Sequence, residues 1–296
     1  MTDVVIRPLT AGEESLFDSM PDPLPQLRKV SYADGIAGGG YRPEHTWIAL
    51  HNKEVVARAA WLLPPGAVGR PWLERFDLVG DPKVGAELLQ AAHRELGGPT
   101  IYHAAMPAHW RLRPEVLAAA GPPMTAARLA GLEEQVERLR FSWAGTPLPE
   151  PSGRYEFRAV TDEAEVRDLI ARVGDPDILT GSEIARQVGG VDLATDPLGW
   201  LPRPQSQWQV ATVHDTPVGV IATAGDACYP LLVYLAAFDE SARGELIAAA
   251  VRALQDEAYE VIADAEARKV AVVADLERTG FRQLRARVTF APTPAD

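Results

Sequence analysis

Hydrophobic and polar residues alternate in short runs along this chain, and the same succession of runs occurs twice. In the first half they predict strands at Val4–Pro8, Trp47–Leu50, Val55–Trp61, Glu74–Val79 and Thr100–Ala104. In the second half they predict strands at Tyr155–Val160, Trp208–Val213, Pro217–Thr223, Leu231–Phe238, Val261–Ala265 and Arg282–Phe290. Alternation with many β-branched residues is typical of half-buried strands. We therefore start from the hypothesis of a duplicated unit.

Two helical segments support the duplication. Glu87–Leu96 and Glu245–Leu254 lie 158 residues apart and share Glu, Leu, two alanines, Arg and Leu in register. Further along, Leu117–Gly121 matches Leu276–Gly280, which predicts a helix that ends at the glycine of each copy. The repeated spacing indicates two copies of one αβ unit.

Each copy also contains a predicted hairpin, with polar turns at Asn52–Glu54 and His214–Thr216. The full order in each copy is strand, helix, loop, three strands, helix, strand, helix, strand. This order is typical of an α/β fold with a central mixed sheet, here present as two tandem domains.

A proline-rich segment separates the two copies. Residues 146–153 hold three prolines within five positions, and proline removes amide donors and keeps the backbone extended. We therefore predict an N-terminal domain at 1–145, a stiff linker at 146–153 and a C-terminal domain at 154–296.

Composition narrows the class of protein. The 296 residues are 47% hydrophobic and 24% charged, as expected for folded domains in water. The net charge of −12 argues against nucleic acid as a partner, because phosphate neutralisation needs clustered Lys and Arg. The single cysteine, Cys228, excludes an intrachain disulfide and a cysteine-rich metal site. With no long apolar run and no secretory signal at the start, we expect no membrane partner and a cytoplasmic location.

The segment Phe238–Leu246, which joins a strand to the second-half helix, has Arg243-Gly244 at its centre, and Gly280-Phe281 closes the last helix. With the duplicated element order, these residues resemble the GCN5-related N-acetyltransferase (GNAT) superfamily in its tandem form. The resemblance covers nearly the whole chain. It implies acetyl-CoA or another acyl-CoA as co-substrate, with its diphosphate at the start of that helix.

The same resemblance implies which residues touch the coenzyme. Its pantetheine arm would lie in a cleft beside the strand Val233–Ala237, where strands part. The implied cofactor-binding residues are Val233, Leu235, Ala237, Ala242, Arg243, Gly244 and Glu245.

Both copies depart from the family pattern. Leu276 and Leu117 stand where the family commonly has an acid-donating tyrosine, and Gly121-Pro122 replaces the Gly-Phe pair. The first-half loop Gly80–Glu87 departs further than its second-half counterpart. We therefore expect the site mainly in the C-terminal half, with a structural or regulatory N-terminal half.

Acyl transfer to an amine needs a base for the amine, donors for the carbonyl oxygen and an acid for the thiolate. The candidate acids and bases lie on or beside the fourth and fifth strands of the second half. They are Asp264, Tyr234 and Asp226, with Tyr229 and Glu266 as further candidates. Asp264 interrupts an apolar strand, and its alternative interpretation is a solvated strand end. Tyr234 is alternatively a packing residue.

Other chemistry-bearing residues have simpler interpretations. His103 and His109 fit no common zinc spacing, so we predict ordinary histidines and no metal site. The stretch Asp175–Trp200 carries several carboxylates beside an aromatic residue, which suits either an amine substrate or a solvated acidic loop.

Three functions stay open. The first is an acyl-CoA-dependent N-acyltransferase that acetylates a small-molecule amine. The second is a catalytically silent pair of GNAT folds that binds acyl-CoA, an acyl carrier protein or a partner protein. The third is thioester hydrolysis or decarboxylation on the same fold.

Overall fold

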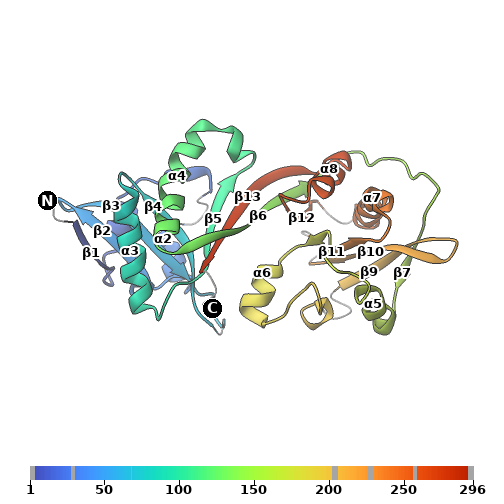
Figure 1. Cartoon of the computed structure of the whole chain (residues 1–296), viewed down its shortest axis with the longest axis horizontal. Helices are drawn as coiled ribbons and strands as arrows, with labels where there is room; N and C mark the ends of the chain where they lie inside the picture. Colours follow the sequence, from blue (N-terminus) through green and yellow to red (C-terminus); the bar gives the residue numbers. More distant parts are fainter. Residues whose placement is uncertain are drawn as a thin grey trace. The chain divides into compact units, whose positions relative to one another are not determined.

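The computed structural model describes residues 4–27, 31–67, 69–201, 206–225, 230–255 and 259–292, and the chain divides into two compact units. Unit 1 consists of residues 1–137 and 285–296, whereas unit 2 consists of residues 138–284. Both units are built from strands and helices in the predicted order, so the predicted mixed α/β fold class is confirmed (Figure 1).

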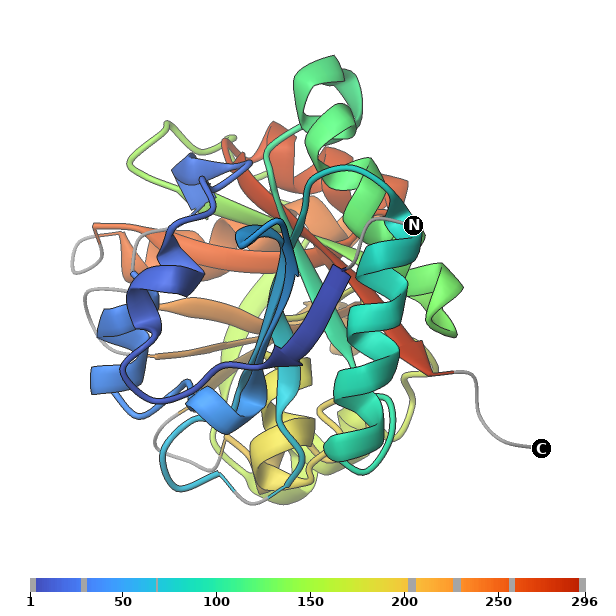
Figure 2. The same cartoon turned by 90° about the vertical axis from the view of Figure 1, so that its left-hand side faces the viewer.

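Unit 1 is a sheet with helices on both faces. The sheet order is β1-β2-β3-β4-β5-β13. The strands are β1 (Val4–Pro8), β2 (Thr46–His51), β3 (Glu54–Leu62), β4 (Trp72–Leu78), β5 (Tyr102–Pro107) and β13 (Arg282–Pro292). The α-helices are α1 (Glu14–Asp18), α2 (Tyr32–Ala37), α3 (Pro82–Glu95) and α4 (Pro114–Leu129), and the short 3-10 turns are η1 (Pro25–Leu27), η2 (Pro43–His45) and η3 (Trp110–Leu112). Figure 2 shows α3 and α4 on one face and α1 and α2 on the other.

Unit 2 repeats this plan. Its sheet order is β6-β12-β11-β10-β9-β7, and the short strand β8 pairs with β11. The strands are β6 (Leu132–Trp143), β7 (Glu156–Val160), β8 (Ile178–Leu179), β9 (Ser206–Val213), β10 (Thr216–Ala224), β11 (Leu231–Ala237) and β12 (Val261–Glu266). The helices are α5 (Glu163–Ile170), α6 (Ser182–Ile184), α7 (Arg243–Leu254) and α8 (Val270–Arg278), with short turns η4 (Ala185–Gly189), η5 (Pro197–Gly199) and η6 (Glu240–Ala242).

Alternating side chains give the sheet of unit 2 a core on each face. Ile221 and Leu235 pack with Leu246 of α7 and Leu276 of α8 in one buried cluster. Trp208 of β9, Val220 of β10 and Tyr234 of β11 join α5 in the other cluster. The period-two pattern of the sequence therefore reflects burial on both faces of a central sheet.

The hairpins have the turns that the sequence predicts. Asn52 and Lys53 have φ of 52° and 69°, and His214 and Asp215 have φ of 47° and 62°. Two consecutive left-handed residues are characteristic of the type I′ turn, whose twist matches that of the flanking strands.

The two halves of the sequence exchange a strand. In unit 2, Arg138–Trp143 of β6 pairs antiparallel with β12, and in unit 1, Arg285–Phe290 of β13 pairs antiparallel with β5. The compact units therefore differ from sequence halves divided at 146–153, and that segment lies within unit 2. Unit 2 is continuous in sequence, whereas unit 1 needs two separate pieces of chain.

The prediction that a helix ends at Gly121 is wrong. Helix α4 continues to Leu129, and Gly131 with φ +88° ends it, as Gly280 with φ +89° ends α8. The first copy has the extra turn η3 and a longer last helix, so a constant spacing between the copies does not extend this far.

In the part of the chain that the structure describes, no helix is both long enough and apolar enough to cross a bilayer.

Candidate functional site

Both units have a β-bulge at the same place in the sheet. Glu74 of β4 is skipped between the pairs Leu73–Trp61 and Arg75–Ala60, and Val233 of β11 is skipped in the same way. A bulge bends its strand away from the neighbour. Accordingly, β4 and β5 share one ladder pair, and β11 and β12 share two. Each unit therefore has a gap between these two strands, as the GNAT resemblance implies.

In unit 2 the chain itself fills this gap. Strand β8 pairs antiparallel with β11, with Leu179 opposite Tyr234 and Ile178 opposite Leu235. Ile178 is 0% exposed and belongs to the core on the side of α7 and α8. We call residues 175–180 the strap.

The hydrogen bonds of the strap occupy the inner edge of β11. The Asp177 amide donates to the Leu235 carbonyl at 2.7 Å, and the Thr180 amide donates to the Val233 carbonyl at 3.1 Å. The Thr180 hydroxyl accepts from the Asp264 amide at 2.9 Å, so it bridges toward β12. The Val233 and Leu235 carbonyls of β11 therefore already have partners within the chain.

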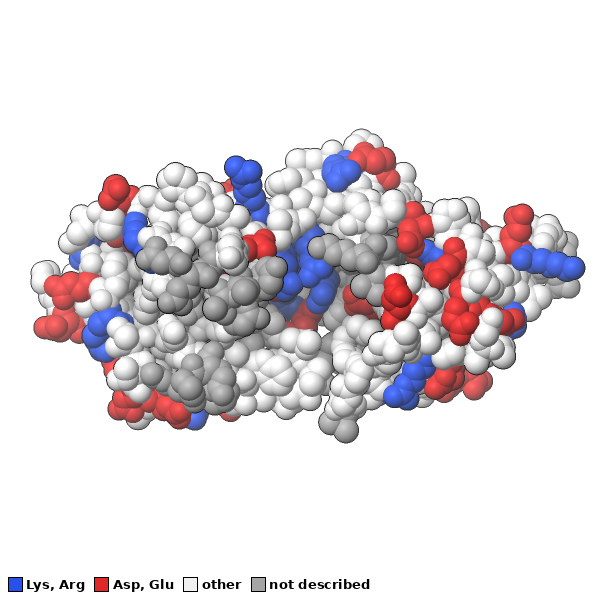
Figure 3. Space-filling model, turned by 180° about the vertical axis from the view of Figure 1, so that it is seen from behind, with Lys and Arg blue, Asp and Glu red and all other residues white. Residues whose placement is uncertain are grey.

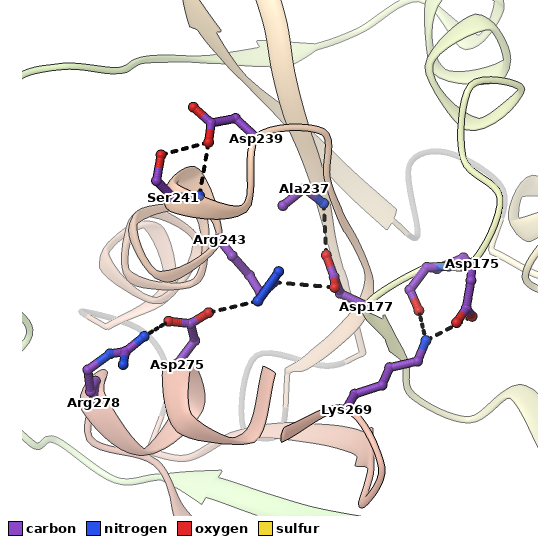
Figure 4. Close-up of polar contacts among 10 residues, drawn as sticks. Asp175, Asp177, Ala237, Asp239, Ser241, Arg243, Lys269, Asp275 and Arg278 are labelled. Carbon is purple, nitrogen blue, oxygen red and sulfur yellow. Dashed lines mark hydrogen bonds and ion pairs between the residues drawn. The ribbon is translucent and has the colours of Figure 1, made fainter. Parts of the chain in front are cut away.

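Arg243, at the start of α7, is held by two carboxylates (Figure 4). Its Nε lies 3.3 Å from Asp177 Oδ1, and its Nη1 donates to Asp275 Oδ2 at 3.2 Å. Arg278 also bonds Asp275, and the second oxygen of Asp177 accepts from the Ala237 amide at 2.9 Å. The Arg243 side chain is 7% exposed, so these pairs lie in a largely dehydrated setting.

A carboxylate of the chain also caps the turn before α7. Asp239 Oδ1 accepts from the Ser241 amide at 3.0 Å and from the Ser241 hydroxyl at 2.7 Å. These hydrogen bonds hold the pKa of Asp239 below its usual value. A helix start attracts anions, and here a side chain of the protein supplies one.

Beside this turn lies an open pocket of about 600 Å³ within unit 2. Its lining comes from the proline-rich segment, η6, α7 and α8. The lining residues are Pro149, Glu150, Pro151, Glu240, Ser241, Arg243, Gly244, Glu245, Ala248, Arg252, Ala271, Asp275, Arg278 and Thr279. Three arginines and four carboxylates therefore share one hollow.

The predicted cofactor-binding residues divide into two groups. Ala242, Arg243, Gly244 and Glu245 lie at the start of α7, and the last three line the pocket. Glu245 accepts a hydrogen bond from the Ser152 amide at 3.2 Å. Val233, Leu235 and Ala237 lie on β11, where the strap bonds their backbone groups. The structure thus assembles the first group around a hollow and closes off the second.

Of the predicted catalytic residues, the structure describes Asp264 and Tyr234, and each has partners of its own. Asp264 accepts hydrogen bonds from Nε and Nη2 of Arg140, both at 2.7 Å, and these bonds raise the pKa of that arginine. Tyr234 is 0% exposed and packs against Trp208, and burial followed by the charge of Asp177 raises the pKa of its hydroxyl. Asp226 lies outside the described residues, as does Tyr229. Glu266 pairs with Arg268 at 2.6 Å.

Unit 1 fills its gap with side chains. Glu74, at the bulge, accepts from the Trp72 indole at 3.1 Å, and its Oε2 lies 3.8 Å from His103 Nδ1 on β5. Burial alone raises the pKa of Glu74, but the nearby His103 and the charge of Arg287 outweigh it, so that pKa is lowered. A cavity of about 30 Å³ remains, lined by these two residues, Asp77 and Tyr102 among others.

Arg58 of β3 binds several polar groups of unit 1. It is 1% exposed, donates to Asp77 at 2.9 Å and to the carbonyls of Phe17 and Met20 at 2.8 and 2.6 Å, and also bonds Asp22. This network fixes the segment after α1 to β3. The spacing along the sequence does not indicate that Arg58 and its partners meet. The one signal is a comparison of the two units, because the pair that matches Arg58 and Asp77 in unit 2 is the apolar pair Val220 and Ala236.

Both units have an apolar residue at the position where the family commonly has a tyrosine that donates a proton. In unit 2 it is Leu276, four residues before Gly280, and Leu276 is 0% exposed. In unit 1 the glycine that ends α4 is Gly131, so the matching residue is Ala127 and not Leu117. The predicted absence of tyrosine therefore holds at the corrected position.

Comparison with known proteins supports the fold. No protein-family model and no curated protein matches the chain. Among solved structures, it is similar to a GCN5-related N-acetyltransferase from Sphaerobacter thermophilus, with 11% identity and a TM-score of 0.52 over 99% of this chain and 98% of that one. This chain has the GNAT fold in duplicate. The resemblance predicted from the sequence is thereby confirmed at the level of the fold.

Two further structures have lower scores. A tandem GNAT protein from the clavulanic acid biosynthesis pathway is 17% identical over 99% of this chain and 100% of that one, with a TM-score of 0.41. A GNAT-family acetyltransferase from Colwellia psychrerythraea is 12% identical over 98% and 100%, with a TM-score of 0.43.

On the face in Figure 3, acidic and basic side chains are interspersed among uncharged ones. Among the described residues, no group of three or more His, Cys, Asp and Glu side chains is arranged to hold a metal ion.

Proposed function

We propose that this protein is a catalytically silent tandem GNAT fold whose unit 2 binds acyl-CoA by its phosphate-bearing end, without transferring the acyl group. The observation that carries the proposal is the strap. Its pairing with β11 uses the Val233 and Leu235 carbonyls, so the arm of the coenzyme has no free strand edge beside it. The nucleotide end, by contrast, has an open hollow.

The pocket at α7 suits a nucleotide in size and position. Its volume of about 600 Å³ lies in the range of small-molecule sites, about 300–1,000 Å³. Arg243, Arg252 and Arg278 line it beside the start of a helix, where phosphate groups bind well. Glu240, Glu245 and Asp275 oppose an anion there. We therefore expect weak binding that falls steeply as salt increases.

The groups needed for acyl transfer in unit 2 are already engaged. Asp264 is paired with Arg140, and Leu276 offers no proton to a thiolate. Tyr234 belongs to the cluster beneath α5, on the face of the sheet opposite α7 and α8. An acid and a base must lie within hydrogen-bond reach of the reacting atoms, and these three residues do not meet that requirement at the pocket.

The test compares whole and truncated ligands. Calorimetry with coenzyme A, acetyl-CoA and the nucleotide fragment 3′-phospho-ADP should give affinities equal within twofold, because only the shared end makes contact. A thiol-release assay with acetyl-CoA over a panel of small amines should give no signal above buffer. Amine-dependent thiol release would overturn the proposal and restore the acyltransferase.

A charge change in the pocket locates the site. Gly244→Glu adds a carboxylate to the pocket wall and should weaken binding of all three ligands at least tenfold. Ala253→Glu, at the exposed far end of the same helix, adds the same charge and should change affinity less than twofold. Equal effects of the two variants would move the ligand elsewhere.

Acyl transfer from an acyl-CoA to a small amine is the second candidate, and one observation favours it. Among the described residues of unit 1 no strand is inserted in the gap, which holds the half-buried Glu74 beside the buried His103. Such a pair can move a proton when a substrate reaches it. If thiol release is found, Glu74→Gln should abolish it, whereas Asp264→Asn in unit 2 should preserve it.

A further inference from the structure

We propose that the strap, residues 175–180, is an internal competitor for the ligand of unit 2, and that Asp177 is its latch. This inference rests on the proposed function, because it concerns how a phosphate-bearing ligand and its arm gain access to unit 2. Asp177 does two things at once. One carboxylate oxygen lies 3.3 Å from Arg243 Nε, and the other accepts from the Ala237 amide at 2.9 Å.

The latch connects two regions that an elongated ligand has to occupy together. Arg243 lines the pocket at α7, whereas the backbone of the strap lies in the gap beside β11. A carboxylate that neutralises Arg243 reduces its attraction for an incoming phosphate. The same residue anchors the first hydrogen bond of the strap, from its amide to the Leu235 carbonyl. Loss of the latch therefore affects both the pocket and the gap.

Arg243 is prepared to change partners. Its Nε is buried and makes no hydrogen bond with the described residues, although it lies at ion-pair distance from Asp177. A guanidinium binds a diphosphate through two parallel hydrogen bonds, a geometry that the present contact with Asp177 does not provide. The Asp177 side chain is 18% exposed, so its carboxylate has a route to water when it is displaced.

Other contacts set how far the strap moves. Lys269 donates to Asp175 at 2.8 Å and to the Pro176 carbonyl, which fixes the entry of the strap to the start of α8 (Figure 4). Ile178 is buried in the core and opposes displacement. We therefore expect local opening of residues 177–180 with residues 175 and 176 still attached.

The ligand class follows from this arrangement. A competitor for Asp177 has to carry an anionic group that reaches Arg243 and a slender extended arm with amide groups, which replaces the backbone hydrogen bonds of the strap on β11. An acyl-CoA has both features, whereas a free nucleotide has only the first.

The experiment uses the full chain with Asp177→Asn and Thr180→Val combined. Both changes keep the shape of the side chain, and together they remove the carboxylate on Arg243 and the hydroxyl between Leu232 and Asp264. Asp192→Asn is the matched control, since it removes an exposed ion pair with Arg186 from the same acidic stretch.

Two readouts judge the proposal. Amide hydrogen exchange at Thr180 and Ala237 should become at least tenfold faster in the double variant and stay unchanged in the control. Coenzyme A should then bind at least tenfold more tightly than 3′-phospho-ADP, because its arm enters the gap, whereas the two ligands bind equally to the unaltered protein.

The outcomes separate this inference from the proposed function. Unchanged exchange at Thr180 and Ala237, with an unaltered melting temperature, would overturn the latch and make the strap a fixed part of the core. Faster exchange with both ligands bound equally would also overturn it, because the arm would not use the gap. If no variant binds either ligand, the proposed function fails, and hydrogen exchange alone decides whether Asp177 holds the strap.

Discussion

Units 1 and 2 share a gap between parted strands, but they fill it with different material. Unit 1 uses side chains, with Glu74 and His103 meeting across the gap, whereas unit 2 inserts the backbone of β8. Side chains can move aside individually, whereas an inserted strand must give up its hydrogen bonds together. One fold can therefore leave this strand edge open or cover it with a short strand while the order of the other strands stays the same.

The helices beside the gap differ in a related way. Gly85 of α3 and Arg243 of α7 lie 158 residues apart, at the spacing of the matched helices. Gly85 packs closely against Ala126 of α4, and Arg243 pairs with Asp275 of α8. In unit 1 the helices α3 and α4 are joined by close packing, whereas in unit 2 the corresponding helices α7 and α8 are joined by an ion pair. At this matched position, only unit 2 has a cation.

The largest expected effect comes from removing the exchanged strand. Deletion of residues 285–296 takes Ala286, Val288 and Phe290 out of the core of unit 1, where they are 1%, 0% and 0% exposed. The two larger side chains each contribute about 1.5–3 kcal/mol by burial, a large part of a typical stability of about 5–15 kcal/mol. Unit 1 should lose its slow hydrogen exchange, and unit 2 should keep it.

A shorter deletion is the control for this experiment. Removing residues 293–296 leaves β13 whole and should change neither unit. Protected amides in β5 after the longer deletion would show that unit 1 does not depend on β13.

Next in size is the loss of the buried arginine of unit 1. Arg58→Met removes a buried guanidinium that donates to Asp77 and to the carbonyls of Phe17 and Met20, which should lower the free energy of unfolding by about 3–5 kcal/mol. Urea denaturation measures the change.

Unit 2 supplies the matched control, since the same register pair there is Val220 with Ala236. Arg58→Val combined with Asp77→Ala copies that pair and should recover part of the lost stability. If the free energy of unfolding of Arg58→Met lies within about 1 kcal/mol of that of the unaltered protein, the Arg58 network is not important for stability.

A third difference between the units is a buried histidine. His93 is 5% exposed in unit 1, and burial followed by the charge of Arg70 lowers its pKa to about 4. The unfolded chain, with an ordinary histidine pKa near 6.5, binds a proton that the folded chain excludes. Stability should therefore fall as pH drops from about 6.5 to about 4, by about 3 kcal/mol over that window.

Denaturation at several pH values tests this prediction. Val251 occupies the matching position in unit 2, so His93→Val makes the two units alike and should remove most of this pH dependence. His214→Asn, in an exposed turn, should leave it in place. A slope that survives His93→Val would assign it to other groups.

The smallest effects distinguish two glycines of unit 1. A Cβ on Gly85 would lie 2.9 Å from the Ala126 Cβ, so Gly85→Ala should cost about 1–3 kcal/mol. Gly121, inside α4, has no atom within 4 Å of that position, so Gly121→Ala should stabilise the protein by up to about 1 kcal/mol. Thermal denaturation of the pair should show opposite signs, and equal signs would contradict the close helix contact.

Much of the fold could be predicted from sequence because the strands are regular. Strand β1 was predicted with the bounds observed, and both hairpin turns lie at the polar residues that the pattern indicated. Strand β6 was missed because Leu132–Trp143 is largely polar and only its two ends are buried. The exchange of β6 and β13 has no local signal, since pairing partners are chosen over long separations.

The site was less predictable for the same physical reason. Arg243 and Gly244 stood out because they lie in one continuous motif. Asp177 was one of several acids in a loop, and only folding places it on Arg243. Glu74 and His103 become neighbours only where two parallel strands part, which spacing along the chain cannot express.

The divided construction of unit 1 also sets an order of events during synthesis. Every strand of unit 2 has left the ribosome once residue 284 is clear of the exit tunnel, whereas β5 gains its partner only when residues 285–290 follow. The half that is translated first is thus the half completed last. During that interval the unpaired edge of β5 can pair with other chains, and slow translation of the final residues would lengthen this exposure.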